Sequence, residues 1–383
     1  MTQRMILNET SYFGKGAIQE IPAEINKRRF KKVIVVTDTA LSSVGIVGKV
    51  TNLLNKAGIV YDLFDGVVPN PTIQNVTDGV KAAQQSEADC IIAIGGGSPI
   101  DTAKAIGIIV TNPEFSDVRS LEGLAATKNP CLPIFAVPTT SGTAAEVTIN
   151  YVITDEENQR KFVCVDPHDI PIVAFVDSDL MMRMPKALAA ATGMDAMTHA
   201  IEGLITKGAW EMTDMLHVKA VEIIGRSLRN AVNGDQESRE EMALGQYIAG
   251  MGFSNVGLGL VHGMAHPLSA WYNIPHGVAC AALLPTVMKY NKDFTGDKYR
   301  LIAEALGLPS ARQLPLESVR DIACEAIEEL SKDVGIPTTL SELGVKEEDI
   351  PKIATDAFSD VCTPGNPKET TIEEIIELYR SLM

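Results

Sequence analysis

The sequence lacks the features that nucleic-acid-binding and membrane-spanning proteins need. Its 33 Lys and Arg residues are outnumbered by 49 Asp and Glu residues, which gives a formal net charge of −16. An acidic surface of this kind repels phosphate backbones and anionic lipid. The longest apolar runs, VIVV and CIIAI, are only strand-sized, and the first residues contain no apolar signal segment. We therefore expect neither a nucleic-acid partner nor a membrane.

Cysteine is also scarce and poorly placed for cross-links. The 383 residues, 45% hydrophobic and 21% charged, are typical of a globular chain long enough for two domains. The spacing of the cysteines predicts neither a disulfide framework nor a structural zinc site, because no CxxC pair occurs. Free thiols in a chain without a signal segment indicate the cytoplasm. The six cysteines are Cys90, Cys131, Cys164, Cys280, Cys324 and Cys362.

The first half of the chain alternates short β-branched runs with helical patterns. Buried strands that end in turns are predicted for KKVIVVTD, IVYDLFDG, DCIIAIGGG, LPIFAVPTT and PIVAFVDSD. The amphipathic segments between them, such as TALSSVGIVGKVTNLLNKAG and TIQNVTDGVKAAQQSEA, complete a βαβα order. This order is typical of a parallel sheet covered by helices. INYVITDEENQRKFVCVD predicts an inserted hairpin.

The second half has a different pattern. From Asp195 onward, long helical stretches such as DMLHVKAVEIIGRSLRNAV and LESVRDIACEAIEELSKDVG are separated by Gly and Pro, and few strand-like runs remain. We therefore predict two domains: an α/β domain of the dinucleotide-binding type over residues 1–184, and an all-α domain over residues 185–383.

The stretch ADCIIAIGGGSPIDTAKAIG predicts a phosphate site made from backbone. A strand ends at Ile94, and three glycines then allow a ligand to approach closely. A helix follows, with Ser98 suited to its N-cap, Pro99 to its first position and Asp101 to a capping box. Its free N–H groups would bind an anion without a basic patch. The stretch matches neither GxGxxG nor GxxxxGK[ST], so a plain tight turn is the alternative.

Two further turns could reach the same ligand. Asp38 ends the strand VIVVTD, where an acid can accept hydrogen bonds from an adenosine ribose. The same carboxylate would repel a 2′-phosphate, which favours NAD over NADP. The alternative role for Asp38 is a helix N-cap. PTTSGTAAE, residues 138–146, is a second turn rich in hydroxyls and glycine after a strand.

Histidine is rare, and its distribution is uneven. Three of the six histidines lie within GLGLVHGMAHPLSAWYNIPHG, residues 257–277. GMDAMTHAIEG places Asp195 and His199 four residues apart, on one face of a predicted helix. Together with His262 and His276 they form a set of one carboxylate and three imidazoles. That set suits Fe²⁺, Zn²⁺, Mn²⁺ or Ni²⁺ and leaves positions open for a substrate oxygen.

The sequence leaves one alternative to this metal site and gives no support to other metal sites. The pair Asp195 and His199 could be an ordinary surface interaction on a helix. No cysteine belongs to the set, which removes support for an iron–sulfur site. His168 and His217 lack other candidate ligands nearby in the sequence and are expected to be structural.

The segment HGMAH raises a question of its own. His262 and His266 are four residues apart, as in a zinc protease helix, but Gly263 stands where HExxH requires its Glu. A metal hydrolase would therefore lack its general base. Pro267 is expected to disturb the helix and to turn His266 away from the other histidines.

Four motifs together resemble the iron-containing (group III) alcohol dehydrogenases: GGGSPIDTAKA, PTTSGTAAEVT, GMDAMTHAIEG and GLGLVHGMAHPLSAWYNIPHG. The resemblance extends over essentially the whole chain. It implies a dehydroquinate-synthase-like fold, with an N-terminal NAD-binding α/β domain, a helical C-terminal domain and an active site in the cleft between them. It implies an NAD-dependent, Fe²⁺-dependent oxidoreductase that interconverts lactaldehyde and propane-1,2-diol or similar short compounds. It also implies a homodimer, in which the strand around Met5–Thr10 crosses to the partner.

The resemblance further implies roles for individual residues. His266 would not bind the metal but would stand beside the substrate and the nicotinamide, where it could relay a proton. The metal, Fe²⁺ or another divalent ion such as Zn²⁺, would be bound by Asp195, His199, His262 and His276. The NAD(H) cofactor would be contacted by Asp38, Asn70, Gly96, Gly97, Ser98, Asp101, Thr139, Thr140, Thr143, Lys161 and Leu188. The small aldehyde or diol would be faced by Asn150, Val152, Phe253 and Cys362.

Three other functions compete with this one. A glycerol dehydrogenase, or another short-chain alcohol dehydrogenase, could share the fold, but the zinc site of a glycerol dehydrogenase would use fewer histidines. A dehydroquinate-synthase-like lyase would need Lys or Arg residues for a phosphorylated substrate, and the motifs offer none. A binding module without catalysis would leave the coincidence of a dinucleotide turn and a full ligand set unexplained.

Overall fold

The computed structural model describes residues 2–383, and the chain forms two compact units. Unit 1 comprises Met1–Thr140 and Ala144–Arg183, and unit 2 comprises Ser141–Thr143 and Met184–Met383. Within residues 2–383, no helix combines the length and the apolar character that a membrane span requires.

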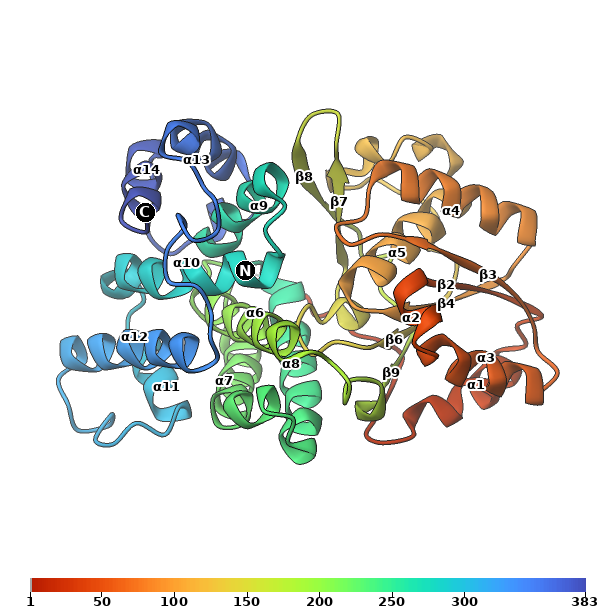
Figure 1. The fold of residues 1–383 in the computed structure, drawn as a ribbon, viewed down its shortest axis with the longest axis horizontal. Coiled ribbons are helices and arrows are strands. Elements are labelled where there is room, and N and C mark those ends of the chain that lie inside the picture. Colours follow the sequence, from red (N-terminus) through yellow and green to blue (C-terminus); the bar gives the residue numbers. More distant parts are fainter. Residues whose placement is uncertain (1) are drawn as a thin grey trace. The chain divides into compact units, whose positions relative to one another are not determined.

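Unit 1 is built on a parallel sheet of six strands in the order β1-β9-β6-β4-β2-β3 (Figure 1). A smaller sheet, β5-β8-β7, contains the antiparallel pair β7 and β8. The five predicted parallel strands and the inserted hairpin are therefore confirmed. The strands are β1 (Thr10–Phe13), β2 (Lys32–Asp38), β3 (Val60–Val67), β4 (Cys90–Gly95), β5 (Gly123–Leu124), β6 (Ile134–Pro138), β7 (Asn150–Asp155), β8 (Arg160–Val165) and β9 (Val173–Val176).

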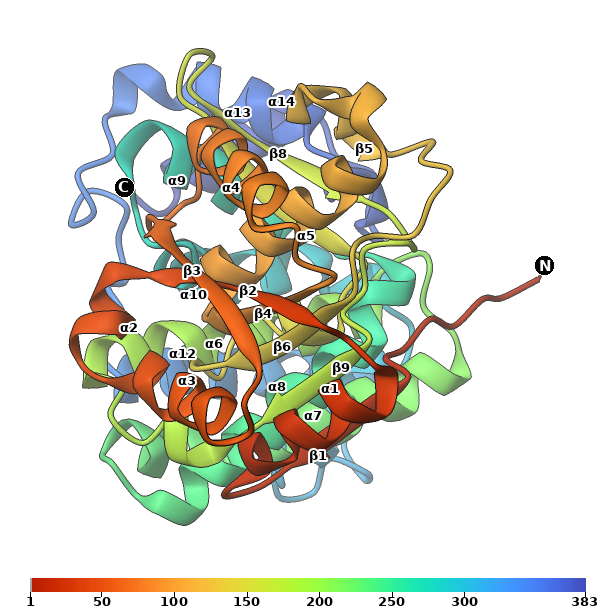
Figure 2. The same cartoon turned by 90° about the vertical axis from the view of Figure 1, so that its right-hand side faces the viewer.

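Helices cover both faces of the six-stranded sheet. Alternate side chains of β2 point to opposite faces: Ile34 and Val36 join the core under α4 and α5, whereas Val33 and Val35 join the core under α1 and α3. Figure 2 shows these two helix pairs on either side of the strands. The helices of unit 1 are α1 (Ile21–Arg28), α2 (Thr39–Ser43), α3 (Ile46–Lys56), α4 (Ile73–Ser86) and α5 (Gly97–Thr111).

Two expectations for unit 1 need correction. The strand β3 is not buried, because it lies at the edge of the sheet, and Val60 and Leu63 are exposed. The amphipathic segment over residues 39–58 is not one helix. It divides into α2 and α3 at Gly45, whose φ of 79° lies in the left-handed region that glycine tolerates.

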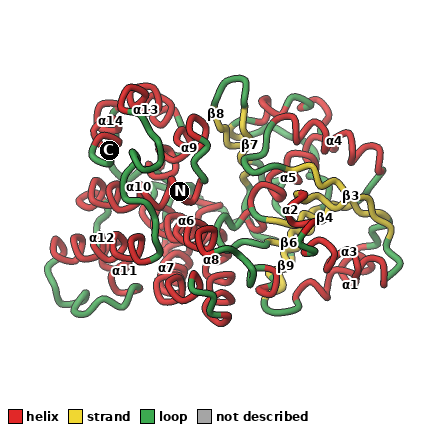
Figure 3. Tube along the Cα trace, in the orientation of Figure 1, coloured by secondary structure: helices red, strands yellow, loops and turns green. Residues whose placement is uncertain are grey.

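Unit 2 is all helical, as predicted, and the described chain contains no strand beyond β9 (Figure 3). The long, Ala-rich helix α6 is buried along most of its length and packs against α7, α8 and α10. The helices are α6 (Lys186–Ile205), α7 (Glu211–Val232), α8 (Gln236–Val256), α9 (Leu260–Tyr272), α10 (His276–Asn291), α11 (Lys298–Ala305), α12 (Leu316–Asp333), α13 (Ile350–Ser359) and α14 (Ile372–Arg380).

Candidate metal and cofactor sites

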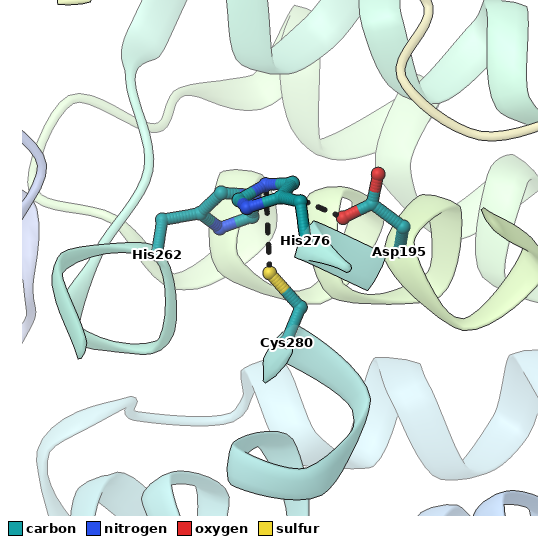
Figure 4. A group of neighbouring side chains, drawn as sticks. All are labelled: Asp195, His262, His276 and Cys280. Carbon is teal, nitrogen blue, oxygen red and sulfur yellow. Dashed lines mark hydrogen bonds and ion pairs between the residues drawn. The ribbon is translucent and has the colours of Figure 1, made fainter. Parts of the chain in front are cut away.

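Four side chains that could bind a metal gather inside unit 2. One ligand atom from each of Asp195, His262, His276 and Cys280 lies within 4.8 Å of the others (Figure 4). His276 Nε2 lies 3.7 Å from Asp195 Oδ1. Asp195 comes from α6, His262 from α9, and the other two from α10. Three of the four predicted ligands therefore meet in space.

A glycine lets α10 begin close to α6. A Cβ atom at Gly277 would lie 2.4 Å from the carbonyl oxygen of Ala191, which is closer than atoms in proteins approach. Because glycine has no Cβ, the first turn of α10 rests against α6 and brings His276 beside Asp195. The Gly that follows His276 in the sequence is thus part of how the site is assembled.

The fourth predicted ligand, His199, lies beside this group. Its ring stacks on that of His262 at a centroid distance of 4.7 Å and on that of Phe253 at 4.2 Å. Within residues 2–383, His199 Nδ1 is buried and has no hydrogen-bond partner. Burial, and secondarily the charge of His262, holds the pKa of His199 well below its usual value, so the imidazole is neutral. A neutral imidazole is the form that binds metals.

Glu202 holds His262 in a defined orientation. Its Oε2 lies 2.6 Å from His262 Nδ1, and its Oε1 accepts a hydrogen bond of 2.6 Å from the backbone N–H of Val261. An ionised carboxylate only accepts hydrogen bonds, so Nδ1 carries the proton and Nε2 is left as the electron-pair donor. Within residues 2–383, that Nε2 is buried without a partner. Glu202 also satisfies the first turn of α9, which begins at Leu260.

His266 has a different carboxylate partner. Its Nδ1 lies 2.7 Å from Asp360 Oδ2, and the backbone N–H of Cys362 donates to Asp360 Oδ1 at 2.8 Å. Burial acts to raise the pKa of Asp360, but the neighbouring His266 outweighs it, and the pKa is lowered. The helix α9 runs through Pro267, so the expected disturbance is wrong. Asp360, rather than the proline, sets the direction of His266.

Cys280 corrects another expectation. The sequence placed no thiol with the ligand set, but Cys280 Sγ lies 3.6 Å from His276 Nε2. The two residues are one helical turn apart on α10, so their side chains lie on the same face. A single thiol is still far from the four that an iron–sulfur cluster needs, so the exclusion of such a cluster is unchanged.

In unit 1, the glycine turn and the second turn lie together. β4 and β6 pair in register, with Gly95 opposite Pro138, and Thr139 N–H donates to the Gly95 carbonyl at 2.9 Å. A Cβ atom at Gly96 would lie 3.0 Å from Thr140 Oγ1. The two turns predicted to reach one ligand are therefore neighbours.

The start of α5 differs from the prediction. The N-cap is Gly96 and the helix begins at Gly97, so Ser98 is already inside the first turn. In the described chain no side chain caps this helix. Asp101 does not form a capping box, because its Oδ2 accepts a hydrogen bond from the backbone N–H of Val152. The first N–H groups of α5 therefore remain available to an anion, which suits a pyrophosphate better than a capped helix would.

A lysine joins α5 to the hairpin. Lys104 is fully buried, and its Nζ donates to the carbonyl oxygens of Thr148 and Asn150, at 2.6 and 2.9 Å, and to Thr148 Oγ1 at 2.8 Å. Burial lowers the pKa of Lys104, opposed by the nearby carboxyl groups of Asp169 and Asp101. Desolvation raises the pKa of Asp101 to about 6, although Lys104 opposes this shift. Asp101 and Lys104, one turn apart, thus hold the backbone at two predicted substrate positions, Asn150 and Val152.

Other predicted cofactor residues occupy turns and termini. Asp38 caps α2, with its Oδ1 accepting from the backbone N–H of Leu41 at 2.8 Å. Asn70 has a left-handed φ of 55°, and its Oδ1 accepts from Lys161 Nζ at 2.8 Å. The remaining predicted cofactor residues lie in unit 2: Leu188 is exposed on α6, and Thr143 lies in Ser141–Thr143.

The remaining predicted side chains are divided between the units. Asn150 and Val152 lie on β7 in unit 1, whereas Phe253 and Cys362 lie in unit 2. His168 Nδ1 lies 2.9 Å from Thr127 Oγ1, and the ring of His217 fills the space against Gly203 and Gly252. Burial lowers the pKa of His217 to about 3. Both histidines lie outside the groups of possible metal ligands found within residues 2–383.

Sequence reasoning missed three residues. Glu202 stands within the quoted motif GMDAMTHAIEG, three residues after His199, so helical spacing places it near the same face. Cys280 could have been found in the same way from His276. Asp360 had no such signal, because 94 residues separate it from His266.

Comparison with known proteins shows the family to which the chain belongs. The family model for iron-containing alcohol dehydrogenase matches residues 8–178, and the C-terminal model of the Fe-containing alcohol dehydrogenase family matches residues 189–383. The chain therefore belongs to the iron-containing alcohol dehydrogenase family, which confirms the resemblance seen in its motifs. Among individual relatives, the lactaldehyde reductase of Escherichia coli (strain K12) is 62% identical over 381 residues, covering 100% of both chains.

Solved structures show the same relationship. A 1,3-propanediol oxidoreductase matches with a TM-score of 0.96 and 40% identity, over 100% of both chains. A sulfoacetaldehyde reductase from Bifidobacterium kashiwanohense, in complex with NAD+, matches with a TM-score of 0.89 and 28% identity, over 100% of this chain and 99% of that one. The predicted fold, an α/β dinucleotide-binding domain and an all-α domain, is confirmed.

Proposed function

We propose that the protein is an NAD(H)-dependent, Fe²⁺-dependent oxidoreductase that interconverts lactaldehyde and propane-1,2-diol. The observation that carries the proposal is the group of carboxylate and imidazole side chains in unit 2. Within residues 2–383, His262 Nε2 in this group and His199 Nδ1 beside it are buried without a hydrogen-bond partner. The full-length identity of 62% to a lactaldehyde reductase supports this choice of substrate. Related short-chain alcohols and aldehydes are expected as secondary substrates.

The donor set fits a divalent metal. Buried polar atoms are normally hydrogen-bonded, and within residues 2–383 neither His262 Nε2 nor His199 Nδ1 has a partner. We assign the metal to Asp195, His199, His262 and His276, a nitrogen and oxygen set that suits Fe²⁺ and also accepts Zn²⁺. When bound, the metal supplies Lewis-acid polarisation of the substrate oxygen.

His266 is the proposed proton relay. Its Nδ1 is held by Asp360, so its other nitrogen, Nε2, is left to exchange a proton with the substrate oxygen or with water. In the reducing direction, the proton leaves Nε2 as the substrate oxygen becomes a hydroxyl. In the oxidising direction, Nε2 takes the hydroxyl proton.

The proposed cofactor site rests on the backbone of unit 1. The uncapped N-terminus of α5 offers backbone N–H groups to a pyrophosphate, and glycine at position 96 lets the two turns pack closely, because a Cβ atom there would lie 3.0 Å from Thr140 Oγ1. Bound NAD(H) supplies or accepts the hydride. We assign NAD(H) contacts to Asp38, Asn70, Gly96, Gly97, Ser98, Asp101, Thr139, Thr140, Thr143, Lys161 and Leu188. The proposed domain limits are residues 1–184 for the cofactor and residues 185–383 for the metal and substrate.

Several finer features belong to the same proposal. The substrate is faced by Asn150, Val152, Phe253 and Cys362. The protein acts in the cytoplasm and forms a homodimer through its N-terminal segment. β1 is an edge strand of the sheet, and an edge strand is where a strand from a partner can be added. Sedimentation of the full chain and of a variant lacking residues 1–9 tests the dimer.

The activity is tested by NADH consumption with lactaldehyde, with and without added Fe²⁺ or Zn²⁺. Glycerol as the alternative substrate separates a glycerol dehydrogenase from a lactaldehyde reductase. Activity that does not depend on a metal, or the absence of NADH consumption, contradicts the proposal. A dehydroquinate-synthase-like lyase or a pure binding protein would give no net consumption of NADH.

Two variants test the assignment of the histidines. Asp195→Ala is expected to lose bound metal and activity together. His266→Ala is expected to keep its metal and to lose kcat by roughly 10²- to 10⁴-fold. His168→Ala, at a histidine outside both groups, is the control and should retain both. If His266→Ala also emptied the metal site, the ligand assignment would be wrong.

A further inference from the structure

A second cluster of ionisable side chains lies beside the proposed metal group. His266, Asp360 and Cys362 bring one ligand-type atom each within 4.8 Å of one another. The side chains of His266 and Asp360 are only 6% and 9% exposed. Burying a carboxylate against an imidazole is costly unless their hydrogen bonds are satisfied. The burial of this carboxylate beside His266 therefore needs an explanation, and metal binding by the neighbouring group does not provide one.

The cluster is held by contacts from several elements. Asp360 follows α13, and its two oxygens have different partners: Oδ1 accepts from the Cys362 backbone N–H, and Oδ2 contacts His266 Nδ1. Both oxygens are thereby fixed, and the carboxylate cannot rotate without losing one bond. The ring of His266 is in turn stacked on that of His276 at a centroid distance of 5.3 Å.

A glycine allows close packing beside this contact. A Cβ atom at Gly263 would lie 2.1 Å from Thr363 Oγ1, so with any other residue the Thr363 side chain, or the segment that carries it, would have to move. Thr363 is itself fixed by a hydrogen bond of 2.6 Å to the Ala357 carbonyl. Gly263, which stands where HExxH has its Glu, therefore lets α9 pack closely against the segment that carries Asp360.

We propose that Asp360 is a positioning residue for the hydride-transfer reaction and that it acts through His266. It keeps the proton on Nδ1, so that Nε2 is the atom that exchanges a proton with the substrate oxygen. When Nε2 gains a proton, the carboxylate balances the positive charge of the imidazolium; when Nε2 gives the proton to the substrate oxygen, the ring returns to the same tautomer. This inference rests on the proposed function of His266 as the proton relay.

The test is a double-mutant cycle of Asp360→Asn and His266→Ala. An Asn keeps the shape and the acceptor for the Cys362 N–H, but its amide favours the opposite tautomer of His266. Asp360→Asn is expected to lower kcat for lactaldehyde reduction by roughly 10- to 100-fold. The metal content and the KM for NADH should stay at their unmodified values. In the His266→Ala background, Asp360→Asn should cause no further loss.

The matched control is Asp356→Asn. Asp356 is one turn earlier on α13 and bonds the same helix α9, through Trp271 Nε1 at 2.9 Å, but it does not touch His266. It should retain full activity. Asp360→Glu, which restores a carboxylate, should recover part of the rate that Asp360→Asn loses.

Each outcome has a distinct meaning. If Asp360→Asn lowers kcat equally with and without His266, or empties the metal site, Asp360 acts structurally and the inference is overturned. If Asp360→Asn has full activity while His266→Ala is impaired, the inference fails but the relay stands. If His266→Ala is itself fully active, the proton relay in the proposed function fails. Should Asp360→Asn fold poorly, the same cycle with Asp360→Glu decides, because a longer carboxylate that restores no His266-dependent rate also overturns the inference.

Discussion

In unit 1, the groups expected to meet the cofactor are backbone atoms and small side chains on turns that follow parallel strands. In unit 2, the groups expected to meet the metal are imidazoles and a carboxylate on helices. One of these imidazoles and the imidazole of the proposed proton relay are each fixed by a further carboxylate. His262 is held by Glu202 and His266 by Asp360. The glycine turn of unit 1 has no side-chain cap in the described chain.

This difference has a physical basis. A dinucleotide is large and carries its own charges, so a shaped turn with free N–H groups can bind it even in an acidic protein. A metal ion is small and needs few ligands at set distances, so each ligand must be held in one rotamer and one tautomer. Unit 1 should therefore be sensitive to added bulk, and unit 2 to the loss of hydrogen-bonding carboxylates.

The largest effect is expected where unit 1 departs from this pattern and uses a buried charge. Lys104→Met removes three hydrogen bonds from the backbone and side chain of the hairpin and leaves Asp101 and Asp169 without their cation. Loss of one partner from a buried charged group costs about 3–5 kcal/mol. Calorimetry should show the unfolding temperature reduced by roughly 6–20 °C.

The matched control for that change is Lys56→Met. Lys56 is exposed on α3, so the same substitution should leave the unfolding temperature almost unchanged. Equal unfolding temperatures for the two variants would show that the buried lysine does not stabilise unit 1.

The next largest effect concerns the metal site. Glu202→Gln keeps the shape and an oxygen for the Val261 N–H, but its amide N–H₂ can face His262 Nδ1 and favour the tautomer that cannot bind through Nε2. Metal affinity should fall by roughly 10- to 100-fold. Titration of the metal-free protein with Co²⁺ measures this. Glu240→Gln, at an exposed position of α8, is the control, and equal affinities in the two variants would contradict a role for Glu202.

A smaller effect is expected from added bulk at the glycine turn. Gly96→Ala places a Cβ atom 3.0 Å from Thr140 Oγ1, so the second turn must shift slightly. A cost of about 1 kcal/mol corresponds to roughly five-fold weaker NADH binding. Isothermal titration with NADH tests this, with metal content as the internal check.

Gly48→Ala is the matched control for this substitution. It lies within α3 with nothing within 4 Å of the added Cβ, so it should stabilise the helix slightly and leave NADH binding unchanged. If Gly96→Ala bound NADH normally, the glycine turn would not be the pyrophosphate site.

The smallest effect on stability is expected at Asp38. Asp38→Gly removes the cap of α2, but glycine is itself tolerated there, so the loss should be only a few tenths of a kcal/mol. Removing the carboxylate should improve the use of NADP, since a 2′-phosphate would no longer be repelled. The ratio of kcat/KM for NADPH and NADH measures this. An unchanged preference would leave Asp38 as a helix cap alone.

The fold was largely predictable because both periodicities are strong in the sequence. The strand and helix patterns of unit 1 and the helical patterns of unit 2 follow from local side-chain alternation. The exposure of β3 was not predictable, because its position at the sheet edge depends on strand order rather than on composition. The division of residues 39–58 into two helices at Gly45 could have been anticipated from the glycine, but the amphipathic pattern of the segment continues across that residue.

The candidate site was predictable in part. Asp195 and His199 share a helix, so spacing alone puts them together, and a cluster of rare histidines marks the second contribution. Partners that are distant in sequence could not be predicted: Asp360 contacts His266 from a segment 94 residues away, which packs closely against α9 where Thr363 meets Gly263. Ser98 and Asp101 fit a capping pattern, but Asp101 bonds to Val152 from the distant hairpin instead.

The buried ammonium group of Lys104 also provides a way to measure the opening of unit 1. An amine reagent cannot reach a side chain with no exposed surface, and all three of its N–H donors are engaged. Its chemical labelling therefore requires unit 1 to open, whereas Lys56 labels in the folded protein. The ratio of the labelling rates of Lys104 and Lys56 therefore reports how often unit 1 opens, and both rates are measured in the same intact protein.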